Sequence, residues 1–173
     1  IIHEFNEREY TVFELLVAML IQSDNTAANK IIDIVGMEKI NKDIKEMGLK
    51  NTVLNRKTTD ERKTKSEVEN ITCALYNSTY LNEENSQMLI DILTRQQIKN
   101  KLALYIPDDL KYEISSKTGD KNGVENDTEL IRLSKGNFTF TVLSMGIPNS
   151  VYGTVTLAKC GKTMWDNVMN NWH

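Results

Sequence analysis

Two short groups of polar residues carry side chains that could do chemistry, Ser23-Asp24-Asn25 and Lys117-Thr118-Gly119. Hydroxyl, carboxylate, amide and ammonium groups are those with which proteins transfer protons and bind anions. Each tripeptide alone is weak evidence, because any tripeptide occurs by chance in unrelated proteins. The pair is more informative, since it is ordered along the chain with about 94 residues between Ser23 and Lys117.

Both groups also have purely structural explanations. Asp24 and Asn25 are of the residue types that cap the N-terminus of a helix. Lys117-Thr118-Gly119 is a plausible end for a strand in any surface hairpin. The elements around the two groups, and the wider sequence, therefore have to decide between a structural and a functional interpretation.

The segment that precedes Ser23 has a helical pattern. Thr11 and Glu14 form a capping-box sequence, in which each side chain bonds the other residue's amide. The apolar run that follows predicts a helix buried on nearly every side and ended abruptly at Gln22. A second helix is expected from near Thr26 to Gly36. Ser23-Asp24-Asn25 would then lie in the break between two helices.

Further helices are expected before the second group. Apolar residues repeat at helical spacing from Met37 to Met47, and Gly48 is a suitable terminator. Residues 51–66 are polar and without periodicity, which predicts a surface loop. Helices are expected at about 66–79 and 83–100, with Asn82 as the cap of the second.

Beyond Pro107 the pattern changes to period two, which predicts strands. One strand runs from about Leu110 and ends at Lys117-Thr118-Gly119, and others cover 128–133 and 137–144 with a turn at 135–137. A final helix is expected after them. Its inward residues, by spacing, are Val151, Val155, Ala158, Trp165 and Val168 or Met169.

Composition bounds the function. The chain has 173 residues, 40% hydrophobic and 26% charged, with a net charge of −3. No basic stripe is present, so nucleic acid is not expected as a partner. No apolar run approaches the roughly 20 residues that span a bilayer. Cys73 and Cys160 are interpreted as small buried hydrophobes, and His3 and His173 do not suggest a metal site. No metal or organic cofactor is implied.

The residues around the two groups resemble those of the class A β-lactamases and penicillin-binding proteins, whose signature is S-x-x-K, S-D-N and K-T-G. Ser23–Asn29 resembles the family's S-D-N-T-A-x-N, and Lys45–Thr52 resembles its loop after the next helix. Arg95–Gln97 and Ile106-Pro107 precede K-T-G as they do in relatives. Gly123–Asp127 resembles the turn to the next strand, so the resemblance covers nearly the whole chain.

The resemblance implies serine acyl transfer or hydrolysis on β-lactams or D-Ala-D-Ala-like peptides. Ser23 would relay a proton to the leaving nitrogen. Lys117 would attract a substrate carboxylate and keep that relay acidic enough to donate. Asn25 would hold the side-chain amide of the substrate and the catalytic lysine.

The same resemblance implies supporting roles for four neighbours. Thr118 would give the substrate carboxylate a second hydrogen bond, and Gly119 would let the substrate lie along the strand edge. The backbone amide of Asp120 would be one of two oxyanion-hole donors. Asp24 is expected to brace its turn through backbone amides rather than to touch substrate.

Two departures from the family pattern limit this expectation. No Ser-x-x-Lys occurs in the 173 residues, so the chain alone is expected to be inactive. Glu-x-x-Leu-Asn, whose glutamate activates the deacylating water, is also missing. Asp60 and Glu61 are candidates for that role, although a solvated charged loop explains both. The complete protein is therefore expected to acylate faster than it deacylates.

The resemblance implies an α+β fold, with an antiparallel sheet covered by helices and a helical lobe that carries Ser23. We expect Ser23, Asn25, Lys117 and Thr118 to converge on one cleft between the lobe and the sheet. We expect one domain over 1–173, with 1–106 mainly helical and 107–173 forming the strands and the last helix. The N-terminal strands and the nucleophile's helix are expected in another polypeptide, either a cleaved N-terminal fragment or a swapped chain. Without it, 137–144 would be an open apolar edge.

A different class of function fits the same residues. A non-catalytic module could recognise penicillin or cell-wall peptide and turn over nothing. Deacylation would distinguish the two. Relatives act mostly outside the cytoplasm, and the sequence itself does not specify a compartment.

Overall fold

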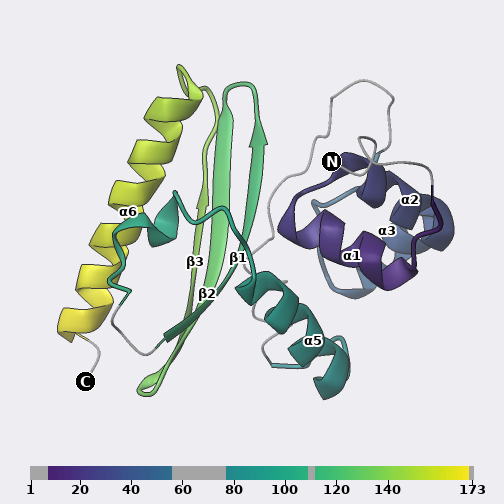
Figure 1. The fold of residues 1–173 in the computed structure, drawn as a ribbon, viewed down its shortest axis with the longest axis horizontal. Coiled ribbons are helices and arrows are strands. Elements are labelled where there is room, and N and C mark those ends of the chain that lie inside the picture. The colour runs from purple at the N-terminus through teal and green to yellow at the C-terminus, as the bar shows by residue number, and fades with distance from the viewer. Residues whose placement is uncertain (1–7, 56–76, 109–111, 172–173) are drawn as a thin grey trace. The chain divides into compact units, whose positions relative to one another are not determined.

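The computed structural model of the chain describes residues 8–55, 77–108 and 112–171, shown in Figure 1. The chain divides into two compact units, residues 1–67 and 68–173. The described part of the first unit holds α1 (Val12–Ile21), α2 (Asn25–Val35) and α3 (Met37–Glu46). The second holds α5 (Glu83–Thr94), the 3-10 helix η2 (Leu102–Tyr105), β1 (Tyr112–Lys121), β2 (Val124–Leu133), β3 (Gly136–Leu143) and α6 (Ser150–Asn171). The fold is α+β, as predicted.

The capping box at the start of α1 is confirmed. The Thr11 hydroxyl accepts a hydrogen bond from the Glu14 amide at 3.2 Å, and the Glu14 carboxylate accepts one from the Thr11 amide at 2.8 Å. The prediction that α1 is buried on nearly every side is wrong, because only Leu15 and Ile21 are buried and the first turn leaves Val12 57% and Phe13 49% exposed. Three short helices do not supply enough surface to cover every face of one of them.

Glycine ends both of the next helices, as the sequence predicts. Gly36 follows α2 with φ 85° and Gly48 follows α3 with φ 78°, a region that glycine enters without steric cost. Asn41 of α3 then bonds the main chain of Leu54 twice, at 2.8 and 3.0 Å. These bonds fix the start of the predicted loop, of which 51–55 is described and is neither helix nor strand.

Asn82 caps α5 by accepting a hydrogen bond from the Asn85 amide at 2.8 Å, as predicted. The helix ends at Thr94 rather than near residue 100. The buried side chain of Gln96 explains the early end, because its oxygen accepts from the amides of Gln97 and Ile98, which are thereby bonded outside a helix. Of the helix predicted at 66–79, residues 77–79 form a turn and 66–76 lie outside the described residues.

The three strands form an antiparallel sheet in the order β1-β2-β3. The prediction that Lys117-Thr118-Gly119 ends its strand is wrong, because β1 continues to Lys121, which pairs with Val124. A two-residue turn, Asn122-Gly123, closes this hairpin, and Gly123 adopts a positive φ of 72°, a region that glycine enters without steric cost. The longer ladder holds the tripeptide inside a paired strand rather than at a free end.

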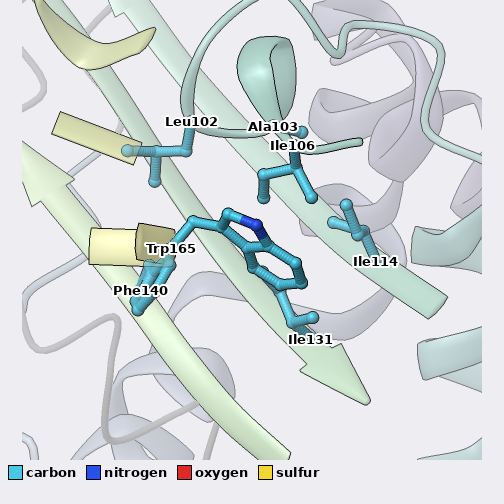
Figure 2. Close-up of a cluster of buried hydrophobic side chains, with 7 residues drawn as sticks. All are labelled: Leu102, Ala103, Ile106, Ile114, Ile131, Phe140 and Trp165. Carbon is cyan, nitrogen blue, oxygen red and sulfur yellow. The ribbon is translucent and has the colours of Figure 1, made fainter. Parts of the chain in front are cut away.

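One face of the sheet carries the apolar core of the second unit. Figure 2 shows the indole of Trp165 from α6 surrounded by buried aliphatic and aromatic side chains of η2 and the strands. These are Leu102, Ala103, Ile106, Ile114, Ile131 and Phe140. Phe138 lies beside them, with ring centroids 4.9 Å from Phe140 and 6.3 Å from Trp165.

The inward face of α6 differs in part from the prediction. Ala158 and Trp165 are buried as expected and Val168 is partly buried, but Val151 is 74%, Val155 39% and Met169 41% exposed. Leu157 and two glycines, Gly153 and Gly161, are buried in their place. The spacing of large apolar residues did not predict this face, because α6 makes two of its close approaches through glycines, Gly153 against Glu125 of β2 and Gly161 against Leu102 of η2.

Gly161 is the closest point of that approach. A Cβ atom placed there would lie 2.0 Å from the Leu102 carbonyl oxygen and 2.7 Å from the Leu102 Cα. Both are main-chain atoms of η2 and cannot turn away as a side chain could. Gly161 therefore sets how deeply η2 sits between α6 and the sheet.

Cys160 of α6 is a free, partly buried thiol packed against the core, in keeping with its interpretation as a small hydrophobe. Cys73, His3 and His173 lie outside the described residues. Within 8–55, 77–108 and 112–171, no helix combines the length and apolar character needed to cross a membrane.

Gly161→Ala is expected to lower the free energy of unfolding by about 1–3 kcal/mol through overpacking against Leu102. The direction of this change is informative, because replacing glycine by alanine inside a helix otherwise raises the free energy of unfolding by roughly 1 kcal/mol. Urea unfolding followed by tryptophan fluorescence measures the change, with the exposed Lys159→Ala as control. A stabilised Gly161→Ala protein would show that η2 is not held this closely.

Candidate active site

Ser23-Asp24-Asn25 forms a tight turn between α1 and α2. The Asp24 carboxylate accepts a hydrogen bond from the Ala27 amide at 2.8 Å, and the side chain is only 6% exposed. This makes Asp24 the N-cap of α2, as its residue type alone also explains. α2 accordingly begins at Asn25 and not at Thr26.

Ser23 is exposed and has φ 51°, in the left-handed region. A residue other than glycine pays about 1–2 kcal/mol for that conformation. The surrounding structure holds it there, because the Asp24 amide bonds back to the Ala18 carbonyl at 3.2 Å. Backbone strain of this kind is concentrated at functional sites, although it does not by itself identify one. Asn25 is exposed beside it.

Lys117 lies half-buried in β1. Its Nζ atom donates a hydrogen bond to the Thr118 carbonyl oxygen at 2.6 Å. Burial lowers the pKa of Lys117, and the nearby carboxylates of Asp120 and Asp127 partly oppose that effect. A cation that is poorly hydrated in this way gains more than a surface lysine does from an added counter-ion.

Thr118 and Gly119 differ sharply in burial. Thr118 is 5% exposed, whereas Gly119 is exposed. A Cβ atom at Gly119 would meet only the Asn126 Cβ, at 3.9 Å, which is an ordinary contact. Packing within the described residues therefore does not require glycine at this position.

A buried ion pair that sequence reasoning missed lies beside this part of β1. Lys101, just before η2, is only 2% exposed, and its Nζ atom lies 2.6 Å from a Glu125 carboxylate oxygen. The same Nζ forms an ion pair with Asp120 and donates to the Asn126 carbonyl at 3.4 Å. Ser150 of α6 donates a further bond to Glu125. Burial alone would raise the pKa of Glu125, but these bonds from Lys101 and Ser150 bring it below its ordinary value.

Two more carboxylates follow Glu125 on the same face of β2, Asp127 and Glu129. The Leu102 amide donates to one Asp127 oxygen at 3.3 Å, and the Ala103 amide bonds Glu129. Burial raises the pKa of Asp127 to about 7 and that of Glu129 to about 8. The second oxygen of each has no hydrogen-bond partner among the described residues.

The acidic residues at 125, 127 and 129 alternate along the sequence, and this pattern could have indicated the carboxylates on one face of β2. Three carboxylates at period two on one strand indicate a polar face, which a purely apolar sheet core would exclude. Nothing local marks Lys101 as buried, because its partners are separated from it by 19 and 24 residues in the sequence.

The sequence-predicted residues thus fall in two separately described units. Ser23, Asp24 and Asn25 share one turn of the first unit, and Lys117 to Asp120 share β1 of the second. Their convergence on one cleft stays a prediction. Asp60 and Glu61 lie outside the described residues.

The sequence profile of the beta-lactamase enzyme family matches residues 1–168. The chain belongs to this family. None of the functionally curated proteins matches the chain significantly.

Solved structures that are similar to the chain share its fold. A beta-lactamase from Sphaerobacter thermophilus superimposes with a TM-score of 0.85 at 24% identity, over 94% of this chain and 65% of that one. PBP-A superimposes with a TM-score of 0.83 at 21% identity, over 98% of this chain and 66% of that one. A mutant of the class A beta-lactamase of the last common ancestor of Gram-negative bacteria gives a TM-score of 0.85 at 20% identity, over 100% of this chain and 70% of that one. The chain therefore spans about two thirds of the length of these similar structures.

The buried carboxylates predict a pH dependence of stability. Asp127 and Glu129 bind protons more tightly in the folded state than in the unfolded chain, whose ordinary pKa values are 3.8 and 4.5. Their contribution is complete below those values and is lost as pH rises through about 7 and 8. The free energy of unfolding should fall between about pH 5 and pH 8, with each carboxyl group adding at most about 1.4 kcal/mol per pH interval of one.

Denaturant unfolding at several pH values, followed by tryptophan fluorescence, measures this slope. Glu129→Gln should flatten it, because a neutral amide cannot titrate, whereas the exposed Asp166→Asn should leave it unchanged. Stability that rises over this pH range in the parent chain would contradict the assignment.

Proposed function

We propose that this chain is the larger part of a serine acyl-transfer enzyme that acts on β-lactams or on D-Ala-D-Ala-like peptides. The observation that carries the proposal is the half-buried ammonium group of Lys117, on a paired strand, in a K-T-G sequence of a beta-lactamase family member. Its poor hydration favours a ligand that brings a carboxylate. One similar structure, of a PBP-A mutant, is described as an acyl-enzyme complex with penicillin-G.

Four consecutive residues of β1, from Lys117 to Asp120, have roles in this proposal. Lys117 attracts the carboxylate of the substrate, and the hydroxyl of Thr118 donates a second bond to it. The exposed Gly119 leaves the strand edge clear, which its own packing does not demand. The backbone amide of Asp120 then polarises the carbonyl under attack.

The turn of the first unit supplies the proton relay. Ser23 passes a proton to the leaving nitrogen, and Asn25 holds the amide of the substrate's side chain. Asp24 fixes the turn through its cap to Ala27 and does not contact substrate. This role needs the two units to meet at one cleft, which is part of the proposal.

The nucleophile lies outside these 173 residues, which contain no Ser-x-x-Lys. A serine without a lysine base is a poor nucleophile, so the chain alone is inactive in this proposal. The chain spans only 65% of the first similar structure, and β3 pairs with β2 alone among the described strands. The segment that carries the nucleophile, whether it belongs to the same chain, to a cleaved fragment or to a swapped chain, would add strands to that edge.

A non-catalytic module that binds penicillin or cell-wall peptide is the second candidate. The absence of Glu-x-x-Leu-Asn from the 173 residues favours it, because an acyl-enzyme that cannot activate water does not turn over. In the enzyme proposal the same absence gives slow deacylation. Acyl transfer to the protein distinguishes the two candidates.

Intact mass spectrometry after exposure to penicillin-G tests the proposal. The 173-residue chain should form no adduct, and a form that includes the Ser-x-x-Lys segment should gain one penicillin that persists. Lys117→Ala should slow acylation about 10²–10³-fold, the usual effect of removing a preorganised electrostatic group.

Lys121→Ala is the matched control, since it removes an exposed lysine from the same strand. Equal acylation of the two variants would contradict the role of Lys117. Rapid steady-state hydrolysis that Glu61→Gln abolishes would instead show that the 51–66 segment carries a deacylating carboxylate.

A further inference from the structure

Beside the proposed carboxylate subsite, formed by Lys117 and Thr118, one buried ammonium group is shared by two carboxylates. Lys101 is the only ammonium that contacts both Asp120 and Glu125 among the described residues. Glu125 is buried, and its lowered pKa keeps it ionised. Two carboxylates thus share one ammonium, and this group of three carries one net negative charge.

The excess charge is exposed at Asp120. Its side chain is 43% exposed, whereas those of Lys101 and Glu125 are 2% and 4% exposed. Asp120 follows Gly119 directly on β1, which pairs with β2 alone among the described strands and so has an open edge. A ligand that extends along this edge past Gly119 therefore meets the exposed Asp120.

Asp120 also affects the protonation of Lys117. Its negative charge favours the charged form of that ammonium, as a ligand carboxylate would. The attraction of Lys117 for an added anion is consequently offset by a carboxylate that is already present. At the exposed edge of β1, the pair of Lys117 and Asp120 is close to neutral.

We propose that Asp120 is a specificity-determining residue that makes this subsite discriminate against multiply anionic ligands and favour zwitterionic ones. A ligand with one carboxylate and one ammonium group satisfies Lys117 and Asp120 together. A ligand with two carboxylates satisfies Lys117 and is repelled by Asp120. The inference rests on the proposed function and specifies the substrate class of the same site.

Three penicillins with a common nucleus test this, using the form of the protein that includes the Ser-x-x-Lys segment. Ampicillin is zwitterionic, penicillin-G has one carboxylate and carbenicillin has two. Acylation rate constants should fall in that order. Asp120→Asn should reduce the ratio of the ampicillin rate to the carbenicillin rate about fivefold, as expected for one partly exposed charge pair.

Glu113→Gln is the matched control, because it removes an exposed, ion-paired carboxylate from the far end of β1. It should leave the ratio unchanged. Salt provides a measurement on the parent protein that needs no variant, since screening of an exposed charge should bring the ratio toward that of Asp120→Asn.

The outcomes separate the two proposals. Acylation with a ratio that neither salt nor Asp120→Asn alters would overturn the role of Asp120 and leave the acyl-transfer function standing. A ratio that shifts equally in Glu113→Gln would overturn it as well. Failure of every penicillin to acylate the parent protein would contradict the proposed function, and this inference with it.

Discussion

The ammonium group of Lys101 is buried where η2 meets β2. The neighbouring elements of the second unit are arranged so that this buried charge is paired and hydrogen-bonded. An isolated buried charge is costly, so a cation in this position must be paired and hydrogen-bonded. Glu125 provides the pair, the Asn126 carbonyl a hydrogen bond, and Asp120 a second carboxylate at the surface. The three carboxyl-bearing residues of β2 at 125, 127 and 129 are thereby committed to the face that η2 covers.

The surrounding elements keep that arrangement in place. Gly153 of α6 lies against Glu125, since a Cβ there would be 2.5 Å from its Cγ, and Gly161 lies against the main chain of Leu102. The amides of Leu102 and Ala103 bond Asp127 and Glu129. η2 is therefore held from one side by Gly161 and from the other by carboxylates, while β1 stays paired with β2 through Lys121.

Sequence reasoning succeeded where the information is local. The capping box at Thr11, the cap at Asn82 and the stop at Gly36 each follow from residues within a few positions of one another, and each is confirmed. The strands were also recognised, although their ends were set by pairing: β1 reaches Lys121 because β2 offers Val124 as a partner.

Reasoning from sequence failed where contacts are distant in the chain. The burial of Lys101 depends on Glu125, and the inward face of α6 depends on how closely Leu102 approaches Gly161. Neither can be seen from periodicity, which assigns glycine and lysine to exposed or flexible positions. Of the candidate site, the residue types came from the two motifs, whereas the electrostatic setting of Lys117 came only from the fold.

The claim that a buried Lys101–Glu125 pair organises the second unit is tested most directly by a double-mutant cycle in the 173-residue chain. Lys101→Met keeps the volume and removes the charge, and it should cost about 3–5 kcal/mol of unfolding free energy because it leaves a buried carboxylate unpaired. Glu125→Gln added to Lys101→Met should recover a large part of that loss, giving a coupling energy well above roughly 0.5 kcal/mol. Losses that simply add, or a Lys101→Met protein as stable as the parent, would contradict the account.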